Sequence, residues 1–377
     1  MRFGEFRSGV YRTQLNNSIG CKYKSFYPTL LNQEWSWENG RINVLVEEAS
    51  RALTELNCFS RFIPNVDVFI EMHIKRESIY STRIEGTKTE LDDLLYDVAE
   101  EKIDDRKEVE NYIDAINFSI ERMQSLPLCN RLLRETHGIL LRGVRGEKKF
   151  PGEFRISQNW IGGSSLASAF FIPPQQDDLA DLMDDLEKFI HNENLALPHL
   201  VKAALLHYQF ETIHPFCDGN GRLGRLLIIL YLINSRMIDR PVLYLSEFFE
   251  KNKNAYYNSL TLVRTENELI GWILFFLEGI IETSNNSKRT LEKILDLQTQ
   301  CSQKIDRNGW KNGRQLLEYL FKKPVVSIRE ISENLEISYN SANALLVRFL
   351  DANLIRKASN KKRGRLFAFE DYIKLFR

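Results

Sequence analysis

Apolar residues recur at the spacing of one helix face through most of this chain. Between residues 38 and 59 they fall mostly three or four positions apart, at Ile42, Leu45, Val46, Ala49, Leu53 and Leu56. A period near 3.6 residues is typical of amphipathic helices that bury one face. The same spacing recurs in the segments 66–79, 91–98, 109–123, 131–141, 179–190, 200–213, 222–233 and 272–297. The sequence therefore predicts a mainly α protein.

Strand signals are few, and the clearest lies between residues 154 and 174. Two short segments, Ile156–Ile161 and Ala169–Ile172, flank the turn-rich residues 162–165, and a pair of prolines follows. Short runs around a glycine-rich turn are typical of a β-hairpin. We expect this hairpin to stand out from the helical body.

Composition and charge narrow the possible partners and compartment. Lys and Arg number 51 and Asp and Glu number 51, so the net charge of zero excludes a basic surface over the whole chain. The longest apolar run, Leu226–Ile233, is shorter than the roughly 20 residues that a membrane helix needs. The N-terminus has no apolar signal-peptide core, and five scattered cysteines favour neither a disulfide framework nor a structural zinc site. We expect a soluble, cytoplasmic protein with no membrane partner.

The last 77 residues differ in charge from the rest of the chain. Residues 301–377 hold 16 Lys and Arg against 8 Asp and Glu, a net charge of +8. Helix candidates at 328–335 and 340–350 precede two strand candidates, 354–357 and 366–369. This order predicts a winged-helix module.

Two functions of this module stay open. Six basic residues lie on or beside its wing, which is typical of contact with DNA phosphates: Arg356, Lys357, Lys361, Lys362, Arg363 and Arg365. The recognition segment 338–350 has only one cationic residue, Arg348, and little besides Asn340 and Asn343 that reads base edges. Protein docking or dimerisation is the alternative to DNA binding.

A short turn between two apolar helices combines groups that bind phosphate. Residues 214–225 read HPFCDGNGRLGR. Gly219, Asn220 and Gly221 allow a tight turn that points amide N–H groups outward, at the positive end of the helix that follows. Arg222 and Arg225 lie three residues apart on that helix, so both can reach a polyphosphate. The turn is therefore predicted to bind a phosphorylated ligand.

Two further side chains of this turn can supply chemistry. Asp218 is a hard oxygen ligand, suited to a Mg²⁺ ion that bridges phosphate oxygens. His214 is a titratable base at the edge of the same turn. The alternative is an ordinary glycine-rich connection between helices, with the charged side chains in surface pairs. The convergence of all these groups on one turn favours a nucleotide site.

Residues 214–225 match position for position the signature H-x-F-x-[D/E]-G-N-G-R-x-x-R of the Fic family, and the resemblance extends over about residues 30–290. Pro151–Arg155 and Gln158–Gly162 resemble the family's flap, and Leu243–Ser246 with the later Tyr256–Tyr257 resembles the segment after the motif. The resemblance implies a Fic-type helical bundle with a β-hairpin flap. It also implies transfer of AMP from ATP, with Mg²⁺, to a Ser, Thr or Tyr hydroxyl of a target protein or of the chain itself.

The resemblance also assigns roles to residues. His214 is expected to act as general base and Asp218 to hold Mg²⁺. The nucleotide is expected to contact Gly219, Asn220, Gly221, Arg222, Leu223, Gly224 and Arg225, with Arg225 on the γ-phosphate. Tyr256 is expected near the adenine, although ordinary packing is the alternative. Ile161 and Phe171 of the flap are expected to pair with an extended target segment, or else only to stabilise the hairpin.

Upstream, residues 81–86 resemble the family's inhibitory motif [S/T]-x-x-x-E-[G/N] through Ser81, Glu85 and Gly86. In this interpretation Glu85 forms a bidentate pair with Arg225 and so removes the partner of the γ-phosphate. The alternative is a polar helix end, with Glu85 exposed and Gly86 terminating the helix. Glu85→Gly is expected to increase transfer.

The sequence predicts three parts: an N-terminal region with the inhibitory helix (1–105), a catalytic core (106–300) and a winged-helix domain (301–377). The first function predicted is autoinhibited protein AMP transfer, and the resemblance suggests a homodimer. One alternative is a Fic relative that removes AMP or moves another phosphate-containing group. The other is a DNA-binding regulator whose core only senses nucleotide.

Overall fold

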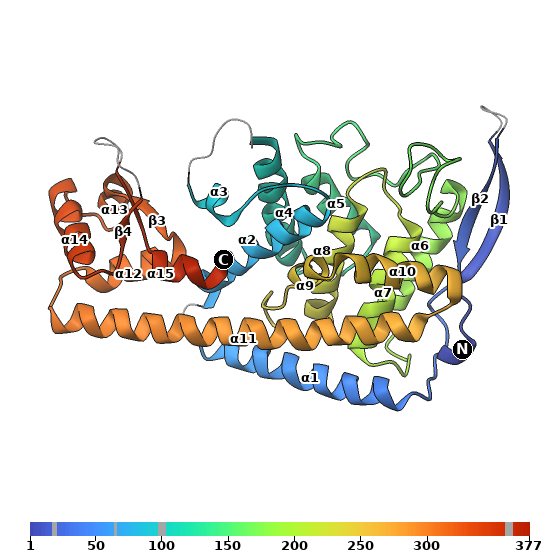
Figure 1. The fold of residues 1–377 in the computed structure, drawn as a ribbon, viewed down its shortest axis with the longest axis horizontal. Helices are drawn as coiled ribbons and strands as arrows, with labels where there is room; N and C mark the ends of the chain where they lie inside the picture. Colours follow the sequence, from blue (N-terminus) through green and yellow to red (C-terminus); the bar gives the residue numbers. More distant parts are fainter. Residues whose placement is uncertain (17–20, 64–65, 97–102, 359–364) are drawn as a thin grey trace.

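The computed structural model describes residues 1–16, 21–63, 66–96, 103–358 and 365–377. Figure 1 shows a helical body with a separate C-terminal unit at one end, both lying along one long helix. The helices of the body are α1 (Gly40–Arg61), α2 (Val66–Ile84), α3 (Leu91–Leu95), α4 (Ile103–Arg122), α5 (Asn130–Leu140), α6 (Leu179–His191), α7 (His199–Ile213), α8 (Asn220–Asn234), α9 (Ser246–Lys251), α10 (Lys253–Glu266) and α11 (Leu269–Arg307). Short 3₁₀ turns lie at η1 (Phe3–Glu5), η3 (Gln176–Asp178) and η4 (Lys374–Phe376). The mainly α fold class is confirmed.

Most helices of the body coincide with the periodic segments of the sequence. The predicted helix 91–98 is helical only as α3, and Val98 lies outside the described residues. Helices α9 and α10 had no clear periodic signal. The long α11 runs beside α1, with ion pairs Lys288–Glu55 and Arg41–Glu278 joining the two.

An N-terminal hairpin escaped sequence analysis. Strands β1 (Gly9–Asn16) and β2 (Cys21–Pro28) pair antiparallel, with Gly9 opposite Pro28. Apolar side chains of β1 are exposed, Val10 and Leu15 each by 57%. Because a strand that is open on both faces needs no alternation of apolar and polar residues, the period-two signal is weak here.

The predicted flap hairpin forms with less strand than expected. Between residues 156 and 172 a single antiparallel bridge joins Ile161 to Phe171, and neither segment is an extended strand. Gly162 and Gly163 both have φ of +70°. A Cβ on Gly163 would lie 2.2 Å from the backbone oxygen of Ser168, so this turn needs glycine.

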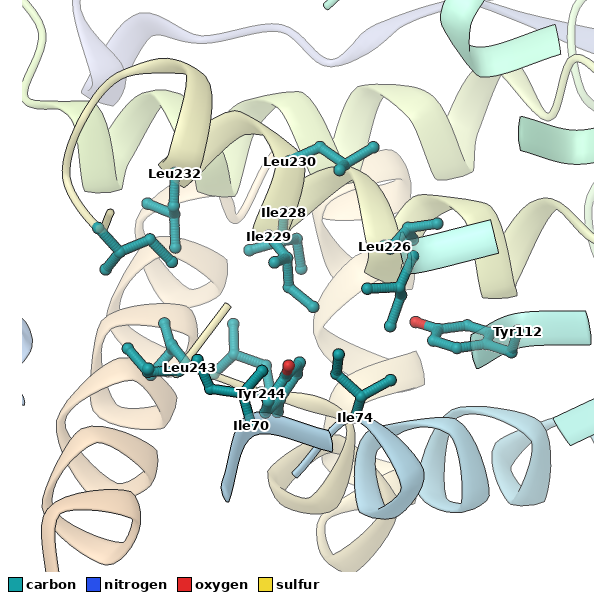
Figure 2. Packing of buried hydrophobic residues seen from close by; sticks show 14 of the residues in the cluster. Ile70, Ile74, Tyr112, Leu226, Ile228, Ile229, Leu230, Leu232, Leu243 and Tyr244 are labelled. Atoms are coloured by element: carbon teal, nitrogen blue, oxygen red, sulfur yellow. The ribbon is translucent and has the colours of Figure 1, made fainter. Parts of the chain in front are cut away.

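Helix α8 forms the centre of the core. Its residues from Leu223 to Leu232 are buried on every side, so α8 lies inside the body rather than on its surface. Figure 2 shows apolar side chains of α8, among them Leu226 and Ile229, on the side that faces Ile70 and Ile74 of α2. The phosphate-type turn and the predicted inhibitory helix therefore belong to one packed unit.

The C-terminal unit contains α12 (Gly313–Lys322), β3 (Val325–Ser327), α13 (Ile328–Asn334), α14 (Tyr339–Asp351), β4 (Arg356–Lys357), β5 (Leu366–Ala368) and α15 (Glu370–Ile373). Its antiparallel sheet has the order β3-β5-β4. This is the predicted order of two helices followed by two paired strands. The basic turn with Lys361, Lys362 and Arg363 lies outside the described residues. Helix α11 continues through residue 300 and ends at Arg307.

None of the helices in the described part of the chain has the length and the apolar stretch that a membrane span requires.

Candidate active site

The turn 214–225 joins the C-terminal end of α7 to the N-terminal end of α8. His214 caps α7 in the left-handed region, with φ 50° and ψ 60°, and Gly219 precedes α8 with φ 75°. The side chain of Asn220 closes the turn: its Oδ1 accepts from the amide of Phe216 at 2.9 Å, and its Nδ2 donates to the Phe216 carbonyl at 2.8 Å. The Asn220 side chain is thus used within the turn. The first N–H groups of α8 are the groups left to bind an anion.

Two side chains from residues 155–159 hold the backbone of His214 in place. Arg155 Nε donates to the His214 carbonyl at 3.0 Å, and Arg155 is 2% exposed. Asn159 Nδ2 donates to the carbonyls of His214 and Phe216 at 3.1 and 3.0 Å. Hydrogen bonds to these carbonyls stabilise a left-handed conformation that is costly for a non-glycine residue. Sequence analysis assigned this stretch to the flap and missed both contacts.

The His214 ring is neutral at physiological pH. Burial, together with the nearby Arg155 guanidinium, lowers the pKa of His214 to about 4. Its Nδ1 lies 3.4 Å from the carbonyl oxygen of Glu211, which can only accept, so Nδ1 carries the proton. Nε2 therefore keeps its lone pair. A neutral imidazole of this tautomer can act as a general base.

Asp218 is the one carboxylate of the turn. Its Oδ1 accepts from the Gly219 amide at 2.7 Å, and its Oδ2 lies 3.3 Å from Lys149 Nζ. The described residues contain no group of three or more His, Cys, Asp or Glu that could hold a metal ion by themselves. Mg²⁺ commonly binds through one or two carboxylates together with substrate phosphates and water. A single carboxylate beside an anion-binding turn fits that donor set.

His137 of α5 supports the Asp218 backbone and was not predicted to take part. Its Nδ1 accepts from the Gly152 amide at 2.9 Å, so its Nε2 carries the proton and donates to the Asp218 carbonyl at 2.9 Å. The ring also stacks on Phe216, with centroids 3.8 Å apart. Burial lowers the pKa of His137 to about 4, which keeps this arrangement neutral.

Arg225 is bound to the end of α2, at the residues predicted to inhibit. Its Nε donates to Ser81 Oγ at 3.0 Å, and its Nη2 donates to the Ser81 carbonyl at 2.8 Å and to Glu85 Oε1 at 2.7 Å. The pair with Glu85 thus uses one guanidinium nitrogen rather than the two predicted. Burial raises the pKa of Glu85, but Arg225 outweighs burial and lowers it, so the carboxyl stays ionised.

Two glycines adapt this region, one through a close approach and one through its backbone conformation. A Cβ on Gly221 would lie 2.3 Å from Glu85 Oε1, so glycine lets the carboxylate reach the surface of α8. Gly86 has a φ of 105°, in the region that favours glycine. The sequence predicted that Gly86 ends the helix, which is consistent with its positive φ. It did not predict the close approach of Glu85 to Gly221.

Arg222 contacts a different partner from the one expected. It is 2% exposed, and its Nη1 lies 2.9 Å from Oε2 of Glu108, a buried residue of α4. A second contact joins its Nη2 to Asp218 Oδ1 at 3.6 Å. Leu223, beside it, is fully buried in the core. The predicted phosphate contact of Arg222 stays a prediction.

The pocket beside the turn has a volume of about 290 Å³. Its lining comprises Glu85, Trp160, Ile161, Gly162, Glu211, His214, Gly221, Arg225, Tyr256, Tyr257, Leu260 and Arg264. Tyr256 is only 1% exposed, and its hydroxyl lies 2.8 Å from Nε2 of the buried His207. Tyr257 is 43% exposed and presents the larger aromatic surface. Sequence analysis could not tell these neighbours apart, because their difference depends on the helix face that α10 turns inward.

The two predicted flap residues differ in position. Ile161 lines the pocket, and its amide donates to the Phe171 carbonyl at 2.8 Å. Phe171 is 7% exposed, and it packs on Phe26 and beneath the Arg264 guanidinium at 4.1 Å. The side chain of Phe171 therefore stabilises the base of the flap. Its role in target binding stays a prediction.

Two regions of the chain match models of known families. Residues 127–232 match the Fic/DOC family, and residues 44–121 match the Fic/DOC family N-terminal region. Over 128 residues the chain is 35% identical to Protein adenylyltransferase Fic of Drosophila erecta and 34% identical to the protein of that name from Aedes aegypti. These stretches are 34% of this chain and 23% of each relative, so the chain spans about a quarter of the length of the curated relatives it matches.

Solved structures show the same fold. A Fic family protein from Desulfovibrio desulfuricans aligns with a TM-score of 0.57 and 20% identity, over 89% of this chain and 98% of that one. Fic-1 of C. elegans aligns with a TM-score of 0.52 and 19% identity, over 68% of this chain and 74% of that one. The turn 214–225 and the helix before Glu85 both lie within the matched regions. Residues 127–232 of the chain are thus similar to the Fic/DOC family and residues 44–121 to its N-terminal region, and the chain shares the fold of solved Fic proteins.

Proposed function

We propose that this protein is a protein adenylyltransferase, which transfers AMP from ATP to a Ser, Thr or Tyr hydroxyl of a target protein or of itself. The observation that carries the proposal is the meeting of three groups at one pocket: the neutral His214, the first turn of α8 and Arg225. A base, a set of N–H donors and a cation are what attack on a phosphate ester needs. Relatives in the matched region carry the same activity in their names.

In the proposed reaction the hydroxyl oxygen attacks the α-phosphorus of ATP. Nε2 of His214 takes the hydroxyl proton as the new O–P bond forms. The bond between the α-phosphorus and the oxygen bridging to the β-phosphate breaks, and pyrophosphate leaves with that electron pair. The N–H groups of the first turn of α8 stabilise the charge that develops on the phosphate oxygens.

Asp218 is the residue that would hold Mg²⁺ in this reaction. Bound Mg²⁺ supplies charge neutralisation at the phosphate oxygens. Lys149 forms an ion pair with the same carboxylate at 3.3 Å. Lys149 therefore competes with a metal ion for this carboxylate.

Inhibition by Glu85 is part of the proposal. The γ-phosphate of ATP and the Glu85 carboxylate compete for Arg225, whose Nη2 already bonds Glu85 at 2.7 Å. With Glu85 in place, a bound triphosphate loses its cation and its α-phosphate is held out of line with the hydroxyl. The Ser81 contacts hold the guanidinium at the end of α2 in the inhibited state.

The test compares wild type, Glu85→Gly and the double variant Glu85→Gly, His214→Ala. Each purified protein is incubated with ATP labelled at the α-phosphate and, separately, at the γ-phosphate. We expect covalent α-label on Glu85→Gly, much less on wild type, none on the double variant and no γ-label on any. Transferred γ-label overturns AMP transfer, and the absence of α-label from Glu85→Gly overturns transfer to the chain itself. Equal α-label on wild type and Glu85→Gly overturns inhibition alone.

Other predicted properties are tested separately. The alternative activity, removal of AMP, is tested with a protein that already carries AMP. Release of free AMP from that protein would indicate removal rather than transfer. The exposed face of α14 and the net charge of +8 in residues 301–377 support DNA binding as a second candidate function. Retention of the full chain on duplex DNA that falls steeply with salt tests it. Sedimentation tests the predicted homodimer.

A further inference from the structure

Glu211 is a buried carboxyl group that the proposed reaction does not use. It lies in the last turn of α7, lines the pocket and is 9% exposed. Its Oε1 has no hydrogen-bond partner among the described residues. A buried carboxyl oxygen without a partner is costly, and such atoms in a folded protein call for an explanation.

The position of Glu211 relative to α8 indicates which part of a nucleotide it faces. A Cβ on Gly224 would lie 2.2 Å from Glu211 Oε1, so this carboxyl rests directly on α8 at Gly224. The Glu85 carboxylate rests in the same way on Gly221. Residues three apart lie on one face of a helix, about 4.5 Å apart along its axis. Glu211 therefore lies one turn beyond the phosphate end of the pocket.

When ionised, a carboxyl group at this place repels the phosphates, whereas it accepts hydrogen bonds from hydroxyl and amino groups. Burial raises the pKa of Glu211 to about 7, with Arg225 acting against it. In both protonation states an oxygen remains that can accept. The donors that a nucleotide carries away from its phosphates are the ribose hydroxyls and the amino group of its base.

We propose that Glu211 accepts a hydrogen bond from the nucleoside half of the bound nucleotide, from a ribose hydroxyl or the exocyclic amino group. The inference rests on the proposed function, because it requires a nucleotide in this pocket. It also explains Gly224, which sequence analysis assigned to the nucleotide: this glycine makes room for the carboxyl. Glu211 is thus a specificity residue for the nucleoside, distinct from Arg225, which serves the phosphates.

The experiment measures binding without turnover, in the full chain carrying Glu85→Gly and His214→Ala. Calorimetry compares this parent with the parent plus Glu211→Ala. The ligands are ATP, 2′-deoxy-ATP, 3′-deoxy-ATP, the triphosphate of purine riboside, which lacks the amino group, and inorganic triphosphate. At a pH above 7, where Glu211 is ionised, loss of a hydrogen bond to this charged group weakens binding by about tenfold or more.

We expect Glu211→Ala to weaken ATP binding about tenfold and to leave the binding of inorganic triphosphate unchanged. The analogue that lacks the donor group should bind the parent as weakly as ATP binds the Glu211→Ala variant. Its affinity should not fall further in that variant, and this identifies the group that donates to Glu211. Equal weakening of ATP and inorganic triphosphate, or unchanged ATP binding, overturns the inference. A parent that binds neither ATP nor its analogues overturns the proposed function instead.

A second variant tests the same contact without removing the carboxyl. Gly224→Ala places a methyl group 2.2 Å from Glu211 Oε1, too close for both, and so pushes the carboxyl off α8. We expect the same selective loss of ATP binding relative to inorganic triphosphate. Unchanged ATP binding by a folded Gly224→Ala protein also contradicts the inference. Circular dichroism confirms that each variant is folded.

Discussion

Removal of Glu108 is expected to destabilise the protein strongly, because it leaves the Arg222 charge buried. The two side chains are 4% and 2% exposed, and their contact is 2.9 Å long. Breaking a buried pair by removing one partner costs about 3–5 kcal/mol. Asp218, 3.6 Å from Arg222, compensates in part, so we expect about 3 kcal/mol for Glu108→Ala. At about 2 °C for each kcal/mol, the melting temperature should fall by about 6 °C.

The same helix supplies a matched control. Glu110 pairs with Arg106 at 2.8 Å, but these side chains are 49% and 32% exposed. Exposed pairs of this spacing contribute about 0.5 kcal/mol or less, so Glu110→Ala should hardly change the melting temperature. Urea denaturation and calorimetry of both variants measure the difference. If Glu108→Ala costs no more than Glu110→Ala, burial of the pair does not have the energetic effect assigned to it.

Three further predictions concern the base, the turn and the C-terminal unit. The pKa of His214 is lowered to about 4 from an ordinary 6.5, so the imidazole stays neutral down to that pH. Initial rates of AMP transfer by Glu85→Gly should therefore fall only near pH 4. A pH–rate profile with its midpoint near 6.5 would contradict this. Asn220→Ala removes both hydrogen bonds to Phe216, so urea titration should show a free energy of unfolding lowered by about 2 kcal/mol. The same variant should also lose nucleotide binding. Phe321 is 2% exposed and packs against Phe69 of α2. Phe321→Ala should lower the free energy of unfolding by about 3–5 kcal/mol. A loss under about 1 kcal/mol would contradict the packing role of Phe321.

Local sequence patterns account for most helices and for several charged groups of the candidate site. His214, Asp218 and Arg225 lie within twelve residues, so a motif could bring them together before any fold was known. The partner of Arg225 was found through a second motif, at Glu85, although 140 residues separate the two. Each of these residues has a recognisable local pattern.

Contacts without a local pattern could not be predicted. Glu108 reaches Arg222 across 114 residues, and nothing in the periodicity of α4 distinguishes it from the exposed Glu110. Arg155 binds the His214 carbonyl because residues 151–159 pass beside the end of α7, which only the tertiary fold determines. In the sequence, Glu211 cannot be distinguished from any other carboxylate on a helix, because its contact with Gly224 of α8 depends on the tertiary fold.

The packing of α2 limits how the proposed inhibition can be released. Its N-terminal half contacts Phe321 and Phe376 of the C-terminal unit, and its buried Glu77 accepts hydrogen bonds from neighbouring helices. Moving α2 as a whole would break all of these contacts at once, at a cost of several kcal/mol. Glu85 lies one residue beyond the end of α2, its side chain is 32% exposed, and Gly86 follows it with a positive φ. In the proposed mechanism, a γ-phosphate therefore has to displace one carboxylate at the end of a fixed helix, rather than the helix itself.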